Sequence, residues 1–438
     1  TSFHRKVVVI TGFSWTFVAF EIIVISLVVL PVLGSFGVTP KSDPVLYGVV
    51  ASATLAGSFF GSLILGWLPD RTGRPRIFLA SILWYSVFTA ATAASFNPAS
   101  VFAFRFLAGL GLGGMLVVDP AVLSEFLPPQ SRGRFMVLLD FFWPLGFLLA
   151  IAFWWVFIIQ GVTAAGVESW RILFLAAAFP AFIAAFARWL IPESPFYYAR
   201  HGRLPESAKV LTRITGHEVS SSTLAAEKAV PRAPVLALFQ GKLARRSVVT
   251  MVTWTALNFS SYGLFLWLPT ILPDFGLQEL NPAVSGFTLL ALFLVASALA
   301  QFPGYLASMV LVDRWGRKRT LALFLILGGV SGYLFATATS FMTVLVSLIL
   351  VSFFNLGAWG AVYAYTPELF PTQYRATGFG MAEGVGKVTS IFGPVMFGYL
   401  LGYTGGIIAP LTVIAVVMAL GGLFLAGVGP ETKGLTFE

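Results

Sequence analysis

Long apolar stretches recur along the whole chain and limit its possible folds more than any other feature. Twelve of them approach or exceed the ~20 mainly apolar residues that a membrane-spanning helix needs. They cover residues 7–33, 45–68, 77–96, 99–124, 135–159, 170–191, 247–272, 284–311, 320–340, 342–366, 379–403 and 406–428. A soluble domain of 438 residues could not bury a chain that is 58% hydrophobic and 10% charged. The sequence therefore predicts an all-α membrane protein with twelve transmembrane helices.

A polar segment at residues 196–245 divides the twelve stretches into two sets of six. Within it, residues 204–214 and 234–243 carry apolar side chains at helical spacing, which predicts short amphipathic helices. We expect a linker of this kind between an N-terminal six-helix bundle, residues 1–195, and a C-terminal bundle, residues 246–438.

Basic residues are concentrated at alternate ends of the predicted helices. The main clusters lie at Arg71–Arg76, Arg132–Arg134, Arg200–Arg246 and Arg314–Arg319. Since basic loops remain on the cytoplasmic side, we expect both termini and the linker to be cytoplasmic, in a plasma or inner membrane. The formal net charge of +9 forms no single basic patch, so nucleic-acid binding is not expected.

The two halves repeat short motifs in the same order. Asp70-Arg-Thr-Gly-Arg74 returns as Asp313-Arg-Trp-Gly-Arg317, and Pro192-Glu-Ser194 returns as Pro430-Glu-Thr432. Matching motifs at matching places indicate two pseudo-symmetric halves. Parallel halves of this kind are used for alternating access, with the substrate bound between them.

The repeated loop motif, together with Arg105-Phe-Leu-Ala-Gly-Leu-Gly-Leu-Gly113 on the fourth stretch, resembles the signatures of the major facilitator superfamily. Within it, Glu125-Phe-Leu-Pro128 and Tyr262-Gly-Leu-Phe-Leu-Trp-Leu-Pro269 are most similar to the niacin permease and synaptic vesicle glycoprotein 2 group. Pro192-Glu-Ser-Pro195 resembles the related sugar porters. The resemblance covers essentially the full chain and implies secondary transport of a small organic solute.

One feature of sugar porters is missing. The resemblance to them leads one to expect paired glutamines on the seventh helix, but Ala256, Leu257 and Asn258 stand in that region. This departure argues against a hexose as the substrate.

Acidic and basic residues of the repeated motifs lie at the predicted cytoplasmic helix ends. We expect them to bridge the halves when the transporter is outward-open and so to bias a two-state equilibrium. One predicted network contains Asp70, Arg74, Glu125, Arg134 and Glu193, and the other contains Asp313, Arg317, Glu368, Arg375 and Glu431. The alternative is ordinary positive-inside charge.

Ionisable residues inside apolar stretches cost about 2.5–3.5 kcal/mol or more when isolated, so each needs a partner or a water-filled cavity. The resemblance to proton-coupled sugar porters implies that Glu21 on the first stretch faces Arg105 and couples protonation to conformational change. The alternative is a static ion pair that fixes helix packing. Asp140 falls where these relatives place a cavity glutamine, which implies a substrate contact or second proton site. Otherwise it is a satisfied carboxylate near Trp143.

Glu383 and Lys387 are four residues apart and share one helix face. They can neutralise each other, or Lys387 can contact substrate, as related carriers of phosphate and organic anions imply. Tyr262, Trp359 and Tyr363 can stack on a planar ring, although aromatic residues also serve packing and interfacial belts.

The chain has no cysteine, three scattered histidines and no phosphate-binding loop, so we expect no metal, no cofactor and no enzyme activity. The leading hypothesis is a monomeric, proton-coupled symporter of an aromatic or carboxylated, niacin-like solute. One alternative is a carrier or facilitator of a sugar, polyol or organic cation, contacted by Glu21, Asp140 and Glu383. Another is a non-transporting membrane receptor of the same fold.

Overall fold

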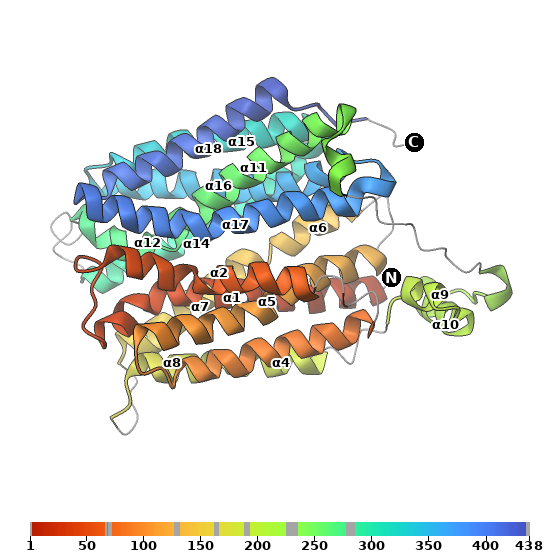
Figure 1. Ribbon diagram of the computed structural model, residues 1–438, viewed down its shortest axis with the longest axis horizontal. Coiled ribbons are helices and arrows are strands. Elements are labelled where there is room, and N and C mark those ends of the chain that lie inside the picture. The colour runs from red at the N-terminus through yellow and green to blue at the C-terminus, as the bar shows by residue number, and fades with distance from the viewer. Residues whose placement is uncertain are drawn as a thin grey trace.

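The computed structural model describes most of the chain, and these residues form helices and no strand element (Figure 1). The described ranges are 2–65, 68, 72–126, 132–161, 166–187, 193–224, 235–276 and 285–434.

Seven main helical segments form the N-terminal half. They are α1 (Ser2–Gly34), α2 (Pro44–Leu65), α4 (Arg74–Thr92), α5 (Pro98–Phe126), α6 (Arg132–Asp140), α7 (Trp143–Trp154), which continues as a π-helical turn (Trp155–Ile159), and α8 (Ser169–Ala187). The fifth predicted span is thus divided between α6 and α7. Pro144 lies in the first turn of α7 and has no N–H to donate to the Asp140 carbonyl, so the helix breaks beside that acid.

The C-terminal half repeats this arrangement. It contains α11 (Gly241–Phe265), α12 (Leu268–Ile271), which ends in a 3₁₀ turn (Leu272–Phe275), α14 (Gly286–Arg314), α15 (Arg317–Ala336), α16 (Phe341–Glu368), α17 (Thr372–Thr404) and α18 (Ile408–Val428). Among the described residues, nine helices are long and apolar enough to cross a membrane by themselves. With α4, α8 and α11 they make the predicted fold of twelve transmembrane helices in two halves, which is confirmed.

The halves lie side by side as two layers of roughly parallel helices (Figure 1). They meet where α2 packs against α17 and where α7 packs against α14. The first contact joins the second transmembrane helix of one half to the fifth of the other, and the second contact does the reverse. This exchange of equivalent partners is what a pseudo-two-fold axis between the halves requires.

Two short helices, α9 (Pro195–Arg200) and α10 (Leu204–Thr215), lie beside the bundles at the end where both termini are found (Figure 1). The predicted amphipathic helix at residues 204–214 is confirmed as α10, which buries Val210 and Ile214 and stops at the left-handed Gly216.

The second predicted amphipathic segment is different. Val235–Phe239 forms a 3₁₀ turn, and α11 begins directly after it at Gly241, inside the segment expected to be linker. Gly241 takes a positive φ of 53°, which lets the chain turn sharply into the helix. The division of the chain at residues 195 and 245 stays a prediction.

Candidate functional site

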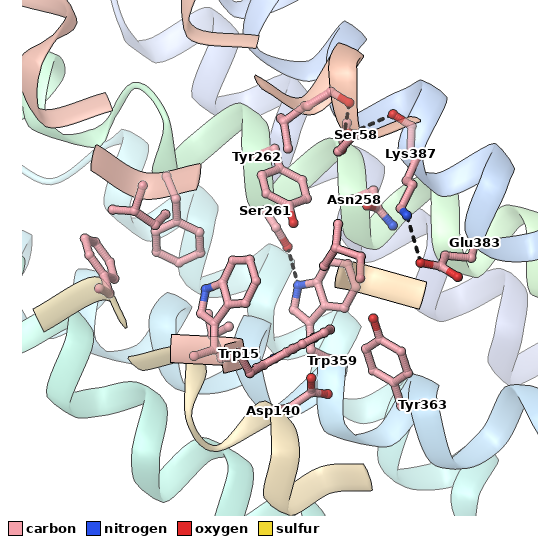
Figure 2. Close-up of a pocket in the computed structure, with 18 of the residues that line it drawn as sticks. Trp15, Ser58, Asp140, Asn258, Ser261, Tyr262, Trp359, Tyr363, Glu383 and Lys387 are labelled. Carbon is pink, nitrogen blue, oxygen red and sulfur yellow. Dashed lines mark hydrogen bonds and ion pairs between the residues drawn. The ribbon is translucent and has the colours of Figure 1, made fainter. Parts of the chain in front are cut away.

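A cavity of about 800 Å³ lies between the two halves, as Figure 2 shows. Its walls come from α1, α2, α5, α6 and α7 on one side and from α11, α14, α16 and α17 on the other. Because both halves supply the walls, any movement of one half against the other changes the cavity.

Aromatic contacts close the cavity at the end of the bundles away from the termini. The Tyr47 and Trp267 rings lie 4.7 Å apart between centroids, and the Trp267 indole N–H donates to the Pro394 carbonyl at 2.9 Å. The Tyr47 hydroxyl forms a hydrogen bond with Thr270. Gly48 allows α2 to approach the Pro394 carbonyl closely, because any Cβ there would collide with it. A solute can leave at this end only if α2 separates from α17.

An ion pair lies on the C-terminal wall. Lys387 Nζ lies 3.1 Å from Glu383 Oε1, and both side chains are largely buried. They point toward the cavity from α17 (Figure 2). Apart from this ion pair, Lys387 Nζ makes no hydrogen bond among the described residues, so at least two of its three N–H donors can bind a ligand.

The aromatic wall is held rigidly. The Trp359 indole N–H donates to Ser261 at 2.9 Å, and the Ser261 hydroxyl donates to the Asn355 side chain at 2.7 Å. Tyr363 and Tyr262 flank Trp359, with ring centroids 6.0 and 6.3 Å away. All three predicted aromatic residues therefore lie together on the cavity, with Tyr363 tilted by 32° and Tyr262 by 74° from the Trp359 plane.

Asp140 reaches the cavity from the N-terminal half, at the break between α6 and α7. It is 5% exposed, and its Oδ2 has no hydrogen-bond partner in the described part of the chain. The Trp15 indole lies near its carboxyl group without a well-aligned hydrogen bond (Figure 2). Trp143, its predicted neighbour, also lines the cavity. Asp140 therefore presents an acceptor to the cavity.

Glu21 and Arg105 meet as the resemblance implied, but they lie behind the cavity wall. Arg105 Nη1 is 3.1 Å from Glu21 Oε2, and Nη2 donates to the Glu21 carbonyl at 2.6 Å. Thr54 accepts from Arg105 Nε at 3.1 Å, while Thr89 donates to Glu21 Oε2 at 2.9 Å. Arg105 is 0% exposed and Glu21 1%. Neither residue lines the cavity, so neither contacts a solute bound there.

The first predicted gate network is described only in part. The Arg74 backbone N–H donates to Glu193 Oε1 at 3.2 Å, directly after Gly73 at a φ of 93°. Asp70 and the side chains of Glu125 and Arg134 lie outside the described residues.

All five residues of the second predicted network lie among the described residues. Arg317 lies 2.9 Å from Glu368 and 3.9 Å from Asp313, and Arg375 donates to the Pro367 carbonyl at 3.1 Å. These contacts join helix ends within the C-terminal half. That the residues bridge the halves in an outward-open state stays a prediction.

Glu431 follows α18 and is held by the turn between α14 and α15. Burial raises the pKa of its carboxyl group, but four backbone N–H groups bind the carboxylate and together lower the pKa below 4.5. These donors belong to Arg317, Lys318, Thr432 and Lys433. In the N-terminal half, Glu193 accepts the corresponding hydrogen bond from the Arg74 backbone N–H. The repeated sequence motifs therefore form the same hydrogen bond in both halves.

The cavity residues that were not predicted as site residues include Trp15, Trp254, Asn258 and Gln301. Gln301 is 1% exposed, and its Oε1 has no partner among the described atoms. An amide inside an apolar stretch is a signal that could have identified Asn258 and Gln301. No sequence signal distinguishes the two tryptophans from packing residues.

Comparisons with known proteins agree with this geometry. The family model for sugar (and other) transporters matches residues 8–438. The niacin transporter NiaP of Acinetobacter baylyi is 34% identical over 440 residues, covering 100% of this chain and 96% of that protein. A putative niacin/nicotinamide transporter NiaP of Bacillus subtilis is 31% identical, covering 99% and 98%. The xylose transporter XylE from E. coli, in a partially occluded inward open conformation, superimposes with a TM-score of 0.77 at 17% identity, covering 100% of both chains.

Two six-helix halves around a central cavity define a multi-pass membrane transporter that takes a small molecule through the bilayer. The chain belongs to the sugar (and other) transporter family of the major facilitator superfamily, as its sequence signatures predicted. Members of this family are transporters and not enzymes.

Proposed function

We propose that the protein is a proton-coupled symporter that carries a small aromatic carboxylate of the niacin type by alternating access. The observation that carries this proposal is a lysine with unused donors beside a cluster of aromatic side chains in the central cavity. The similarity of the whole chain to a niacin transporter supports the same substrate class.

The cavity offers a partner to each part of such a molecule. Lys387 supplies a positive charge for the carboxylate, and a charge-assisted hydrogen bond of this kind is stronger than a neutral one. Trp359 and Tyr363 offer faces on which a planar ring can stack. Asp140, on the opposite half, can accept a hydrogen bond from an N–H group of the ring or its substituent. A ligand held from both halves favours their closure around it.

Proton coupling is proposed for Glu21. In the low dielectric of the bundle, protonation of Glu21 removes the charge that balances Arg105, so it changes the strongest electrostatic contact between α1 and α5. The change biases the equilibrium between two arrangements of these helices. We further propose that the protein works as a monomer with both termini and α10 on the cytoplasmic side.

A second candidate substrate class is organic cations, favoured by one observation. Asp140 forms no ion pair among the described residues, so it could balance a positive charge. Sugars and polyols, and a receptor without transport, are further alternatives that the cavity supports less directly, since neither requires Lys387.

Calorimetry on the purified protein tests the substrate class. We expect nicotinate to bind, and Lys387→Gln to weaken its binding by about 1.5–3 kcal/mol, or roughly ten- to hundredfold, because one charge-assisted hydrogen bond is lost. Lys242→Gln makes the same chemical change at an exposed position outside the cavity and is the matched control. Nicotinamide, which lacks the carboxylate, should be affected little by either change.

Two results would contradict the proposal. Unchanged nicotinate affinity in Lys387→Gln would make this lysine only a structural partner of Glu383. Binding of amines or polyols to the wild-type protein in place of nicotinate would select one of the alternatives.

A further inference from the structure

A second buried acid, Asp119, lies in the N-terminal half outside the cavity. It stands on α5 about four turns beyond Arg105, and it is 0% exposed. The Ser14 hydroxyl donates to its Oδ2 at 2.7 Å, whereas its Oδ1 has no partner in the described part of the chain. No described cation forms an ion pair with it.

This environment is unusual for a carboxyl group with a purely structural role. Buried acids are normally paired with a cation or satisfied at both oxygens, because an isolated buried carboxylate is strongly disfavoured. Asp119 has one neutral donor and one unused oxygen. A proton is the simplest ligand for the unused oxygen, because protonation of Oδ1 neutralises the buried carboxylate.

Two hydroxyl groups in line on α4, those of Tyr85 and Thr89, lie near the two acids, and of these two only Thr89 forms a hydrogen bond with an acid among the described residues. Tyr85 on α4 is 2% exposed and lies within electrostatic reach of both carboxyl groups. Thr89, one turn further along α4, donates to Glu21 at 2.9 Å. The surroundings of this line are apolar and include Val18, Ile22, Leu112 and Met115.

Asp119 lies closer than Glu21 to the end of the molecule where the termini are found. Its partner Ser14 precedes Glu21 by two turns on α1, which starts at that end (Figure 1). Trp15 and Leu116, the neighbours of Ser14 and Asp119 on their helices, line the cavity. One layer of side chains therefore separates Asp119 from the cavity.

We propose that Asp119 is a second proton-binding site, and that protons pass between it and Glu21 along the hydroxyl groups of Tyr85 and Thr89. In this step Oδ1 of Asp119 gains a proton as the carboxyl group of Glu21 loses one, and the reverse step returns it. The net charge of the N-terminal half therefore stays constant. The transfer role depends on the proposed coupling at Glu21, whereas the protonation of Asp119 can be measured without it.

The charged groups around Asp119 are few. Ser14 on α1 donates to it, and Glu21 lies further along that helix; α4 contributes Tyr85 and begins with Arg74 and Arg76. Helix α2 carries no charged residue. The side chains of Arg132 and Arg134, at the start of α6, lie outside the described residues.

Infrared difference spectroscopy on the purified full-length protein in lipid tests the site without any substrate. Spectra taken as pH is varied detect the carbonyl band of each carboxyl group that gains a proton. We expect Asp119→Asn to remove one such band and Glu21→Gln to remove another. Ser14→Ala keeps the acid but removes its donor, so it should shift the pH midpoint of the Asp119 band and covers the case in which Asp119→Asn does not fold.

A transport measurement then separates the two proposals. In proteoliposomes, Asp119→Asn should lose proton-driven accumulation of nicotinate and keep nicotinate exchange, and Tyr85→Phe should slow accumulation in the same way. A pH-difference spectrum that is identical in wild type and Asp119→Asn would overturn the proton site. If wild type does not carry nicotinate, the proposed substrate fails while the infrared result still decides the role of Asp119.

Discussion

Replacement of Glu21 by glutamine is the sharpest test of proton coupling. Glutamine has nearly the same shape as glutamate and mimics its protonated form, but it cannot release a proton. Its side-chain oxygen can still accept from Thr89 and Arg105, which lie 2.9 and 3.1 Å from Glu21 Oε2. The variant therefore removes one charge from the buried pair and little else.

The structure sets the expected cost in stability. Removal of one partner from a buried ion pair usually costs about 3–5 kcal/mol, because the other charge is left without compensation. Arg105 keeps its hydrogen bonds to the backbone carbonyl of residue 21 and to Thr54, at 2.6 and 3.1 Å. We therefore expect the lower end, about 3 kcal/mol, seen as a lower unfolding temperature of the purified variant.

Transport by proteoliposomes measures the functional effect. Glu21→Gln should abolish accumulation of nicotinate against its gradient when a proton gradient is imposed, yet it should retain exchange of nicotinate across the membrane. Exchange should also depend less on pH, because one of the two proposed proton-binding groups is gone. Glu383→Gln is the matched control: it changes the same residue type inside a span, but on the cavity wall beside Lys387, so it should alter substrate affinity and leave transport coupled to protons.

Two outcomes would refute the reasoning. Undiminished proton-driven accumulation in Glu21→Gln would show that the proton is carried elsewhere. Loss of exchange together with accumulation, in a variant that is still folded, would make Glu21 part of the basic conformational change instead of its coupling to protons.

Three other predictions use the absence of natural cysteines and the geometry of the helix ends. Gly48→Leu should prevent the close contact of α2 with the Pro394 carbonyl, so a cysteine placed at cavity residue 58 (Ser58→Cys) should be labelled faster from the side opposite the termini. No change in rate would contradict the assigned closure. A cysteine at the exposed Ser222 should react with impermeant reagent only from the cytoplasmic side, and labelling of intact cells from outside would reverse the topology. Glu431 has a lowered pKa, so its stabilising effect should be present above about pH 4.5 and decline as pH falls through its folded pKa. The difference in unfolding temperature between wild type and Glu431→Gln should therefore shrink below pH 4.5, and a difference that stays constant would disprove the assignment.

Much of the fold could be predicted because the bilayer imposes a simple rule on the sequence. A spanning segment must satisfy its backbone internally, so length and hydropathy locate helices directly. The details that failed depend on single residues. Pro144 breaks the fifth span after Asp140, and α11 starts within the expected linker because the positive φ of Gly241 lets the chain turn into a helix there. The backbone conformation of a single residue has little effect on the hydropathy averaged over about twenty residues.

The site was predictable only where chemistry makes a residue exceptional. A charge inside an apolar span must have a partner, so the sequence pointed to Glu21, Arg105, Asp140, Glu383 and Lys387. It could not show that the first two lie behind the cavity wall and the other three on it. That distinction depends on which face each helix turns toward the cavity. Because these helices carry apolar residues on all faces, the sequence pattern does not identify that face.

The position of Glu21 behind the wall determines how a proton could act on a solute. The two never meet, so coupling must pass through the protein. Arg105 connects α5 with α1 through Glu21, with α2 through Thr54, and with α8 through the face of Phe174, 5.4 Å away.

The connections through Glu21 and Thr54 are next to the cavity wall. Leu55 follows Thr54 on α2, and Ile23 lies two residues after Glu21 on α1; both line the cavity. Under the proposed mechanism, protonation of Glu21 weakens one of the contacts of Arg105 while the others persist, so α1 is freed to move relative to α2 and α5. Since α2 also forms the closed end with α17, a change at Arg105 reaches both the cavity and the barrier. In the proposed mechanism the proton therefore controls which end of the cavity is open and does not contact the substrate.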